Sequence, residues 1–461
     1  MTLGAAILAG RSVRRRATVS DLTRRQFVKT ASAAAAATFV AGPPSLEAVQ
    51  AKRRYAIVGT GDRATGMWGR PIREQYSDVI EFVGLYDINP KRALTSKDMM
   101  GVACPTYPTF DELCTKAKPD LLMVTTVDAF HADYIVKALD RGMDVMTEKP
   151  MVINEQQCQA VLDAEKRNNR KIVVTFNYRY APKHRTVKEV LMAGEIGKVL
   201  SVDFAWYLDV YHGADYFRRW HRLRNRGGSL FVHKATHHFD LVNWWLSADP
   251  VEVVADGQLK VYGKNGPFRH THCRPCPHKK DCRFHYDITT NANRMRLYVA
   301  NEDADSYHRD GCVFRNDVDI FDTMSAMVKY SNGATMSYSL NAHMPFEGFR
   351  VAFNGDKGRL EVRDYERQPW KQPEGDETEI YLTKSFGERR RVPLVSASTE
   401  GGHGGGDTRL RDLIFRKAAA PDHLKLPDSR AGAMSCLTGI AARKSVDEKR
   451  AIRIADLVTL T

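Results

Sequence analysis

Four cysteines carry the clearest potential for chemistry in this sequence. Two residues separate Cys273 from Cys276, five separate Cys276 from Cys282, and Cys312 is close enough in the chain to join them. A Cys-x-x-Cys knuckle places two thiolates on one metal ion, and four thiolates complete a tetrahedral zinc site. Two disulfide bonds or a four-iron cluster would use the same side chains. We therefore predict a structural zinc site, with disulfides and an iron–sulfur cluster as alternatives.

Two histidines, His233 and His237, are one helical turn apart in a run of residues that favours a helix. Side chains at this spacing lie on one face of a helix. They could bind a metal ion together, or they could transfer protons, because imidazole titrates near neutral pH. The apolar face continues through Trp244 and Trp245, so a pair of packed core histidines is a third interpretation.

A glycine-rich turn near the start of the chain indicates a dinucleotide site. The apolar stretch 55–58 runs directly into Gly59 and Gly61, and a second apolar stretch, 80–86, ends at Asp87. The first glycine permits a tight turn, and the second lets a pyrophosphate approach the backbone. An acidic residue at the end of the second strand binds the ribose hydroxyls of NAD and repels the additional phosphate of NADP. These features in this order predict NAD binding.

The elements that must position these residues alternate along the first part of the chain. Apolar stretches at 121–124, 144–146 and 172–174 alternate with helical stretches at 131–141 and 154–169. Repeated units of this length predict a doubly wound parallel sheet of the Rossmann type. Ligands of such sheets bind at the C-terminal ends of the strands.

The pattern changes beyond about residue 175 to an alternation of period two, as in 200–206 and 334–340. This period indicates strands of a sheet with one covered face, and a helix is predicted over 431–444. The domains predicted from these patterns are a leader at 1–51, a Rossmann domain at 52–175, and an α+β domain at 176–461 with a Cys-rich insertion at about 260–315.

Several short motifs follow one another in a recognisable order, at 59–63, 87–90, 128–131, 148–150, 177–179 and 194–197. In this order they resemble the Gfo/Idh/MocA family of NAD(P)-dependent oxidoreductases, over nearly all of residues 53–460. The resemblance implies a second domain with a mostly antiparallel sheet that closes over the nicotinamide. The residues that we expect to bind NAD are Gly59, Thr60, Gly61, Asp62, Arg63, Asp87, Thr126, Asp128, His131, Glu148, Lys149, Asn177 and Arg179.

Hydride transfer from an alcohol requires a base that takes the hydroxyl proton. In the family that this chain resembles, the Lys of a Glu-Lys-Pro motif and the His of an Asp-x-x-x-His motif carry this role. The matching catalytic residues here are Lys149 and His237, and His233 stands at the position of the usual Asp. Because His233 replaces that Asp, we predict a proton-transfer network that differs from the one usual in the family. In this network His233 assists Lys149 and His237. The resemblance therefore favours catalysis over metal binding for these two histidines.

The segment 211–222 interleaves aromatic residues with Arg and His. It could form the floor and rim of a sugar site, or a surface loop whose arginines pair with acidic residues elsewhere. His212 and Trp220 are the best candidates for substrate contacts, and Lys234 is a third. A glycine-rich loop either brings His403 to the cleft or serves as a flexible connector.

The 461-residue chain has a formal charge of +14, which raises the question of a nucleic-acid partner. The surplus is confined to two patches. Residues 1–51 hold seven Lys or Arg against two acidic residues, and residues 260–296 hold nine against two. Neither patch lies on a predicted recognition helix, so we expect no nucleic-acid partner.

The first basic patch has the layout of an export signal. Arg24 and Arg25 are followed by the Ala-rich run 31–41 and by Pro43 and Pro44. A charged stretch before a short, weakly apolar one is typical of a secretory signal, and the run is too short to span a bilayer. The Arg pair resembles the twin-arginine motif of a pathway that moves folded proteins. We expect a periplasmic or otherwise exported protein without a transmembrane segment; a disordered leader with chance Arg pairs is the alternative.

Together these features predict an exported NAD-binding oxidoreductase that acts on a sugar or sugar derivative by hydride transfer. Free NAD is not expected outside the cytoplasm, so the cofactor should be tightly bound and regenerated within each cycle. An NAD-dependent glycoside hydrolase that oxidises its substrate transiently is the first alternative, and a non-catalytic binding protein on the same fold is the second. We expect a homodimer or homotetramer, because the exposed face of the sheet commonly pairs subunits in the family.

Overall fold

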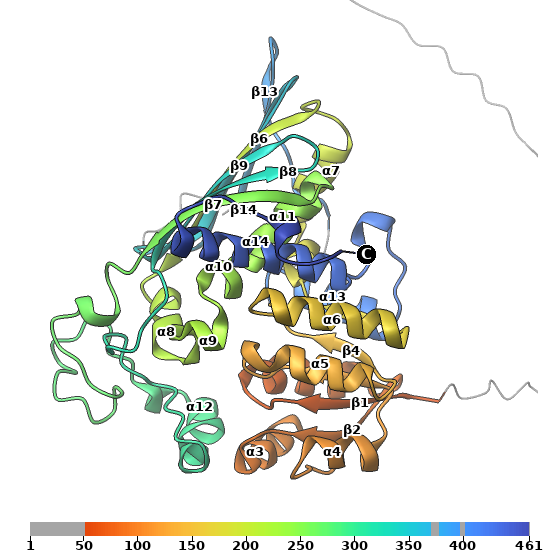
Figure 1. Ribbon diagram of the computed structural model, residues 1–461, viewed down its shortest axis with the longest axis vertical. Helices are drawn as coiled ribbons and strands as arrows, with labels where there is room; N and C mark the ends of the chain where they lie inside the picture. The colour runs from red at the N-terminus through yellow and green to blue at the C-terminus, as the bar shows by residue number, and fades with distance from the viewer. Residues whose placement is uncertain (1–50, 370–377, 397–401, 461) are drawn as a thin grey trace, which may run out of the picture. The chain divides into compact units, whose positions relative to one another are not determined.

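A computed structural model describes residues 51–369, 378–396 and 402–460 (Figure 1). Arg24 and Arg25 of the predicted export signal lie outside these residues. Lys52–Thr461 forms one unit by its internal contacts. None of the helices in the described part of the chain is both long and apolar enough to cross a membrane.

The first part of the chain forms a five-stranded parallel sheet with the strand order β2-β1-β3-β4-β5. The strands are β1 (Arg53–Val58), β2 (Ile80–Tyr86), β3 (Leu121–Val124), β4 (Asp144–Thr147) and β5 (Ile172–Val174). All four residues of β3 and the last four of β1 are buried, as expected for a parallel sheet with helices on both faces. The predicted Rossmann fold is confirmed.

The connections between these strands are helical. They are η1 (Arg63–Gly69), α2 (Arg70–Tyr76), α3 (Pro90–Met100), α4 (Phe110–Glu112), η2 (Leu113–Ala117), η3 (Asp128–Phe130), α5 (His131–Leu139) and α6 (Glu155–Asn168). The side chains of Asn89 and Asn154 cap the starts of α3 and α6 by accepting backbone hydrogen bonds. The π-helical turn η1 continues into α2, so this helical stretch begins directly after the glycine turn.

The second part of the chain is built on a nine-stranded sheet. Its strands are β6 (Val199–Asp209), β7 (Pro250–Gln258), β8 (Thr323–Tyr330), β9 (Thr335–Met344), β10 (Glu347–Gly355), β11 (Gly358–Arg367), β12 (Thr378–Lys384), β13 (Arg389–Arg391) and β14 (Ile452–Arg453). Their order is β13-β12-β11-β10-β6-β9-β8-β7-β14, and only the β6–β9 pair is parallel among these described strands. The mostly antiparallel sheet is therefore confirmed. Buried and exposed residues alternate along β8, as the period-two pattern predicts.

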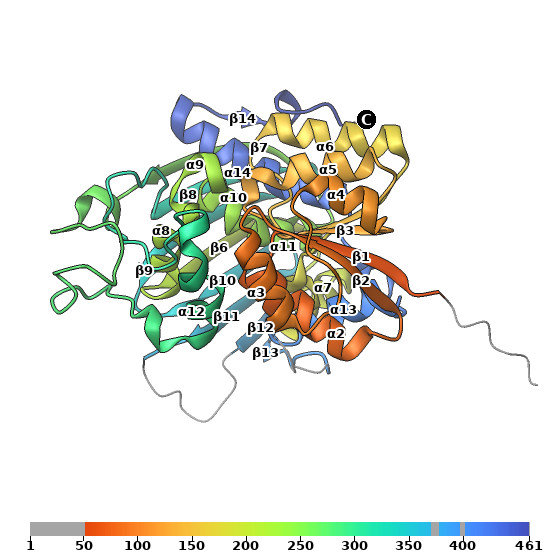
Figure 2. The ribbon, with the colours of Figure 1, turned by 90° about the horizontal axis from the view of Figure 1, so that it is seen from below.

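Helices fill the space between the two sheets (Figures 1 and 2). The helical elements of this part are η4 (Asn177–Tyr180), α7 (Pro182–Met192), α8 (His212–Arg218), η5 (Trp220–Arg222), α9 (Arg224–Gly227), α10 (Leu230–His233), α11 (Ala235–Leu246), α13 (Gly406–Phe415), η9 (Asp422–Leu424), α14 (Ser429–Glu448) and η10 (Ile454–Asp456). The long helix α14 contacts β5 of the first sheet and β7 of the second, so it joins the two domains.

A glycine in α14 sets the position of the short helix α10. A β-carbon at Gly439 would lie only 2.2 Å from the Phe231 carbonyl oxygen, so only glycine permits this approach. Because His233 is the last residue of α10, the packing of α14 against α10 also positions the His233 side chain.

The Cys-rich insertion lies within the connection from β7 to β8. Its helical turns are η6 (Gly263–Asn265), η7 (Ile288–Thr290), α12 (Ala292–Leu297) and η8 (Val299–Ala304). Both α12 and η8 contact α3 of the Rossmann domain, and Figures 1 and 2 show α12 near α3. The insertion therefore reaches from the second domain back to the first.

Candidate functional site

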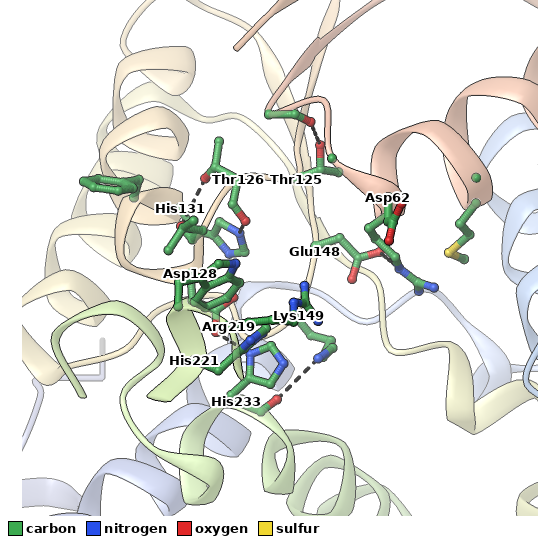
Figure 3. A pocket seen from close by; sticks show the side chains of 18 of the residues that line it. Asp62, Thr125, Thr126, Asp128, His131, Glu148, Lys149, Arg219, His221 and His233 are labelled. Atoms are coloured by element: carbon green, nitrogen blue, oxygen red, sulfur yellow. Dashed lines mark hydrogen bonds and ion pairs between the residues drawn. The ribbon is translucent and has the colours of Figure 1, made fainter. Parts of the chain in front are cut away.

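A cleft of about 1310 Å³ lies between the C-terminal ends of the parallel strands and the helices of the second domain. In Figure 3, Lys149 at the strand ends lies near His221 and His233 of the second domain, and Glu148 turns toward the side of Asp62. The predicted site residues that line the cleft are Gly59, Gly61, Asp62, Arg63, Asp87, Thr126, Asp128, His131, Glu148, Lys149, His212, Trp220, His233, Lys234, His237 and His403. Because ligands of doubly wound sheets bind at this edge, the cleft is the candidate active site.

The glycine turn packs tightly against the neighbouring strand ends. Gly59 has a φ of +84°, and a β-carbon there would lie 2.7 Å from the Thr126 backbone. The Thr60 amide and hydroxyl both donate to Asp87 Oδ2, at 2.7 and 3.0 Å. Thr60 itself is not among the residues that line the cleft, but it holds the Asp87 carboxylate at the cleft wall.

These groups fit a dinucleotide. Gly61 and Asp62 line the cleft directly before η1, where backbone amides at the start of a helical stretch attract a pyrophosphate, although the Asp62 amide already donates to the Tyr298 hydroxyl at 2.9 Å. Asp87 lies at the end of β2, the position of the acidic residue that binds ribose hydroxyls. Arg92 ion-pairs with Asp87 at 3.4 Å and with Asp305 of the insertion at 2.5 Å.

Lys149 lies just beyond the C-terminal end of β4, and its Nζ donates to the His233 carbonyl oxygen at 3.3 Å (Figure 3). Burial lowers the pKa of Lys149 to about 8, against the opposing effect of the Asp128 and Glu148 carboxylates. Half of the Lys149 side chains are therefore neutral near pH 8. A neutral amine in this position can accept a proton from a bound hydroxyl.

The carboxylate next to Lys149 is fixed by two donors. Glu148 Oε1 accepts from Arg63 Nε at 2.6 Å and from Trp68 Nε1 at 2.8 Å. Burial alone would raise the pKa of Glu148, but the Arg63 and Lys149 cations lower it below its usual range, so Glu148 stays ionised. His131 directs its two ring nitrogens to backbone carbonyl oxygens at 2.8 and 3.1 Å, which holds the strand ends together.

His233 has a carboxylate partner from the Rossmann domain. Its Nδ1 lies 2.5 Å from Asp128 Oδ2, and both side chains are buried. Burial raises the pKa of Asp128 well above its ordinary value and lowers the pKa of His233 well below its own. Burial disfavours the charged form of each partner, so it favours a protonated Asp128 that donates to the neutral His233 Nδ1. Asp128 thus brings a carboxyl group from the Rossmann domain next to position 233, where the resemblance expects an Asp.

His237 stacks on the Tyr178 ring, with the ring centroids 4.2 Å apart and the planes inclined by 11°. Lys234 Nζ donates to the Tyr178 hydroxyl at 3.1 Å. Burial lowers the pKa of His237 well below its usual value, and the Lys149 and Lys234 cations act in the same direction. His237 Nδ1 has no hydrogen-bond partner in the described part of the chain. The neutral His237 ring lines the cleft, with its Nδ1 buried.

A second hydrogen-bonded network reaches the cleft from the sheet. His212 Nδ1 lies 2.7 Å from Glu347 Oε1, and His212 Nε2 lies 2.9 Å from the Tyr216 hydroxyl. The carboxylate favours a proton on Nδ1, so Nε2 accepts from Tyr216 and the Tyr216 oxygen can accept from a ligand. Sequence reasoning identified His212 but missed Tyr216, although their spacing of four residues on one helix could have indicated the pair.

The rest of the segment 211–222 also forms part of the cleft wall. Trp220 stacks on His221 with centroids 3.5 Å apart, and the His221 ring meets the His233 ring edge-on. His221 lines the cleft and was not predicted as a site residue. Arg222 also lines the cleft, and it pairs with Asp317 at 2.8 Å. Both interpretations of this segment therefore apply, and both apply to Arg222.

Besides Thr60, two further residues predicted to bind NAD do not line the cleft. Arg179 forms a buried ion pair with Asp240 at 2.5 Å. Asn177 Nδ2 lies 2.5 Å from Asp407 Oδ1 and 2.9 Å from His403 Nδ1. Asn177 thus acts on the cleft indirectly, by holding the loop that carries His403.

The four clustered cysteines are free thiols: Cys273, Cys276, Cys282 and Cys312. Arg218 Nη1 lies 3.4 Å from Cys273 Sγ, and Cys312 Sγ accepts from the Phe314 amide at 3.4 Å. Burial raises the pKa of Cys273, which favours the thiol over the thiolate. Across residues 51–369, 378–396 and 402–460, no group of three or more His, Cys, Asp and Glu side chains is arranged to hold a metal ion. The structure therefore does not support the predicted zinc site.

Two family models match the chain and together cover most of its length. "Oxidoreductase family, NAD-binding Rossmann fold" matches residues 53–176, and "Oxidoreductase family, C-terminal alpha/beta domain" matches residues 188–454; both are models of one family. The chain belongs to the Gfo/Idh/MocA family of oxidoreductases. It is 39% identical over 432 residues to YteT of Bacillus subtilis (strain 168), whose name describes an oxidoreductase, and the match covers 88% of this chain and 98% of YteT.

Solved structures of other Gfo/Idh/MocA-like folds resemble the whole described unit. The aldose-aldose oxidoreductase of Caulobacter crescentus, complexed with glycerol, is 17% identical, with a TM-score of 0.58 over 87% of this chain and 100% of that one. The WlbA dehydrogenase of Chromobacterium violaceum, in complex with NADH and UDP-GlcNAcA, is 18% identical, with a TM-score of 0.59 over 90% of this chain and 98% of that one. At these identities the likeness establishes the fold.

Proposed function

We propose that this Gfo/Idh/MocA protein is an NAD-dependent oxidoreductase that oxidises a hydroxyl of a sugar or sugar derivative by hydride transfer. The observation that carries the proposal is the placement of Lys149. Its buried amine, with a pKa of about 8, lies at strand ends that suit a dinucleotide and beside the Asp128–His233 pair. The sugar nucleotide held by the Chromobacterium dehydrogenase supports a polyhydroxylated substrate.

The residues of the cleft account for the proton in this reaction. Bound NAD⁺ supplies the acceptor for the hydride that leaves the substrate carbon. The neutral Lys149 amine accepts the hydroxyl proton, so that a carbonyl forms as the C–H electron pair departs. His237 and Tyr216, which line the cleft, contact the substrate and fix which hydroxyl faces Lys149.

The preference for NAD over NADP follows from the charges around Asp87. The additional phosphate of NADP would be placed against this carboxylate. Arg92, which could otherwise pair with that phosphate, is already held between Asp87 and Asp305. We therefore propose NAD as the cofactor.

We propose that the protein works as a homodimer or homotetramer. We also propose that it is exported to the periplasm by the twin-arginine pathway as a folded holoprotein. Arg24 and Arg25 in the leader support the export. The bound NAD would then be regenerated in place, with a second carbonyl compound or the oxidised sugar taking the hydride back. Replacing Arg24 and Arg25 by Lys should leave the protein in the cytoplasm, as fractionation and immunoblotting would show. Unchanged export would refute the pathway.

Transient oxidation within a glycoside hydrolase is the second candidate. The observation that favours it is the pair of separate proton networks at one cleft, Lys149 with Asp128–His233 and Tyr216 with His212–Glu347. Oxidation uses one acid–base group, and departure of an aglycone uses another. Incubation with aryl glycosides distinguishes the two functions, because only the hydrolase releases the phenol without net formation of NADH.

The test of the proposed function measures bound NAD and turnover in the same preparation. The purified protein should release NAD on denaturation, and addition of a substrate sugar should reduce the bound NAD and raise absorbance at 340 nm. Lys149→Ala and His237→Ala should each lower this rate by about 100-fold or more while NAD remains bound. Lys116→Ala, at an exposed ion pair with Glu112, is the control. Full biological function in both cleft variants would instead indicate a non-catalytic binding protein.

A further inference from the structure

The insertion between β7 and β8 contains a segment that packs against helix α3 of the Rossmann domain. We call this segment, residues 291–310, the strap. It includes α12 and η8, which contact α3, and it supplies Tyr298, Asp305 and Tyr307 to the wall of the cleft. The cofactor half of the cleft is thus bounded by residues that are far apart in the chain.

The strap is fastened to the start of α3 by several polar contacts. Asn89 Nδ2 donates to the Asn301 carbonyl oxygen at 2.7 Å in a buried position. The buried Arg92 guanidinium joins Asp305 of the strap to Asp87 at the end of β2. Two exposed ion pairs add to these contacts and connect Lys91 to Asp303 and Arg296 to Asp98.

Tyr298 brings a hydroxyl group from the strap to the glycine turn. Its oxygen accepts a hydrogen bond from the Asp62 amide at 2.9 Å, and a β-carbon at Gly61 would lie 3.0 Å from the same oxygen. Burial raises the pKa of Tyr298, so the phenol keeps its proton. Because the Tyr298 oxygen accepts from the Asp62 amide, the hydroxyl proton can be donated to an anion in the cleft.

The Cys-rich loop holds the middle and the C-terminal end of the strap in place. Arg274 ion-pairs with Glu302 at 2.5 Å and with Asp310 at 3.1 Å. The Cys273 amide also donates to the Asp310 carbonyl oxygen at 2.8 Å. The second basic patch of the sequence is therefore part of the support for a segment that reaches the cofactor side of the cleft.

We propose that the strap is part of the cofactor site and retains the dinucleotide, with the Tyr298 hydroxyl as a pyrophosphate ligand. This inference rests on the proposed function, because it requires that the cleft hold NAD. A pyrophosphate at the glycine turn carries negative charge next to a donor that belongs to the second domain. Release of the nucleotide then requires both the loss of that hydrogen bond and the displacement of a segment fastened to α3.

The test compares the NAD content of purified holoprotein variants and the rate at which each releases NAD to an excess of an NAD-consuming enzyme. Tyr298→Phe removes only the hydroxyl and should raise the release rate by about tenfold, the effect of one hydrogen bond to a charged group. Asn89→Ser keeps a capping oxygen for α3 but loses the reach to Asn301, and it should also raise the release rate. Thr289→Val removes a hydroxyl of the same insertion that lies outside the strap and bonds to Asp287, and it should release NAD like the unmodified protein.

The outcomes separate this inference from the function on which it rests. An unmodified protein that contains no NAD and binds it weakly would overturn the proposed function. Retention of NAD by the unmodified protein, with unchanged release from both Tyr298→Phe and Asn89→Ser, would overturn the strap and leave the proposed function intact. Thermal unfolding of each variant shows whether it is folded, and Asn89→Ser tests the strap independently if Tyr298→Phe does not fold.

Discussion

Lys149 shows how burial prepares a single residue for proton transfer. The side chain is withdrawn from water at the strand ends, and the neighbouring Asp128 and Glu148 carboxylates only partly offset the loss of hydration. The result is an amine that titrates near the pH at which enzymes work, whereas an exposed lysine titrates more than two pH units higher. The proposed reaction therefore has a defined pH dependence.

We expect turnover to rise with pH through about 8. Below this value Lys149 is mostly an ammonium ion and cannot accept a proton, and above it the neutral amine predominates. The measurement is the rate of reduction of bound NAD between pH 6 and pH 9.5. Lys149→Arg, which stays protonated throughout, should abolish this rise. A rate that is independent of pH over the range would exclude Lys149 as the base.

Tyr216 should affect binding of the substrate more than the chemical step. Tyr216→Phe removes the oxygen that His212 orients and that faces the cleft, so KM should rise by about tenfold with a smaller change in kcat. Steady-state kinetics with the preferred sugar measure both constants. Tyr211→Phe, on the exposed side chain nearby, is the matched control and should behave like the unmodified protein. An unchanged KM in Tyr216→Phe would mean that this hydroxyl does not contact the substrate.

Among the elements, α10 and α14 decide where the histidines of the cleft lie. The short helix α10 has only four residues, so it cannot hold its own position. The buried helix α14 passes behind it, and the backbones come together at Gly439. The same helix also contacts the edge of the Rossmann sheet, so it aligns His233 with Asp128 across the domain boundary.

Gly439→Ala should therefore lower stability and activity together. The added methyl group would displace the Phe231 carbonyl, and overpacking of this kind reduces the free energy of unfolding by about 1 to 3 kcal/mol. The displacement should also lengthen the Asp128–His233 contact and reduce turnover. Urea denaturation and the rate of NAD reduction measure the two effects. Gly227→Ala, where the nearest atoms to a β-carbon lie at 3.5 Å, should have little effect on stability.

At the scale of the whole molecule, the cleft lies between two domains and is lined by residues of both. Cofactor in the cleft would touch the glycine turn, the strand ends and the strap, so it would join the Rossmann domain to the insertion. A ligand that binds only the folded protein stabilises it according to its concentration and affinity. Tightly bound NAD is therefore expected to contribute to the stability of the protein.

Removal of NAD should lower the melting temperature. A ligand present at 100 times its dissociation constant adds about 2.7 kcal/mol to the free energy of unfolding. Differential scanning calorimetry of the protein before and after NAD is stripped, and again after NAD is restored, measures the change. Equal melting temperatures in the three samples would show that NAD does not bridge the domains.

The sequence allowed prediction of the fold, and most of the predicted cofactor and substrate residues line the cleft, although many lining residues, such as Tyr216, His221 and Tyr298, were not predicted. Strands, glycine turns and the acidic residue at the end of β2 depend on local patterns, which one sequence shows. The partners of these residues depend on tertiary packing. Asp128 meets His233 across 105 residues, and Tyr298 meets Asp62 across 236, and no local pattern indicates either contact. The zinc prediction is not supported within the described residues, because spacing along the chain does not show whether four thiols meet in space.

The parallel pairing of β6 with β9 has a consequence for how the protein forms. These strands are hydrogen-bonded neighbours at the centre of the large sheet, yet residues 210–334 lie between them in the chain. Contacts of such high sequence separation slow folding, because a long loop must close before the contact contributes any stability. The intervening residues include α10, α11 and the whole Cys-rich insertion. We expect the centre of this sheet to assemble late and slowly, in the same step that closes the wall of the cleft.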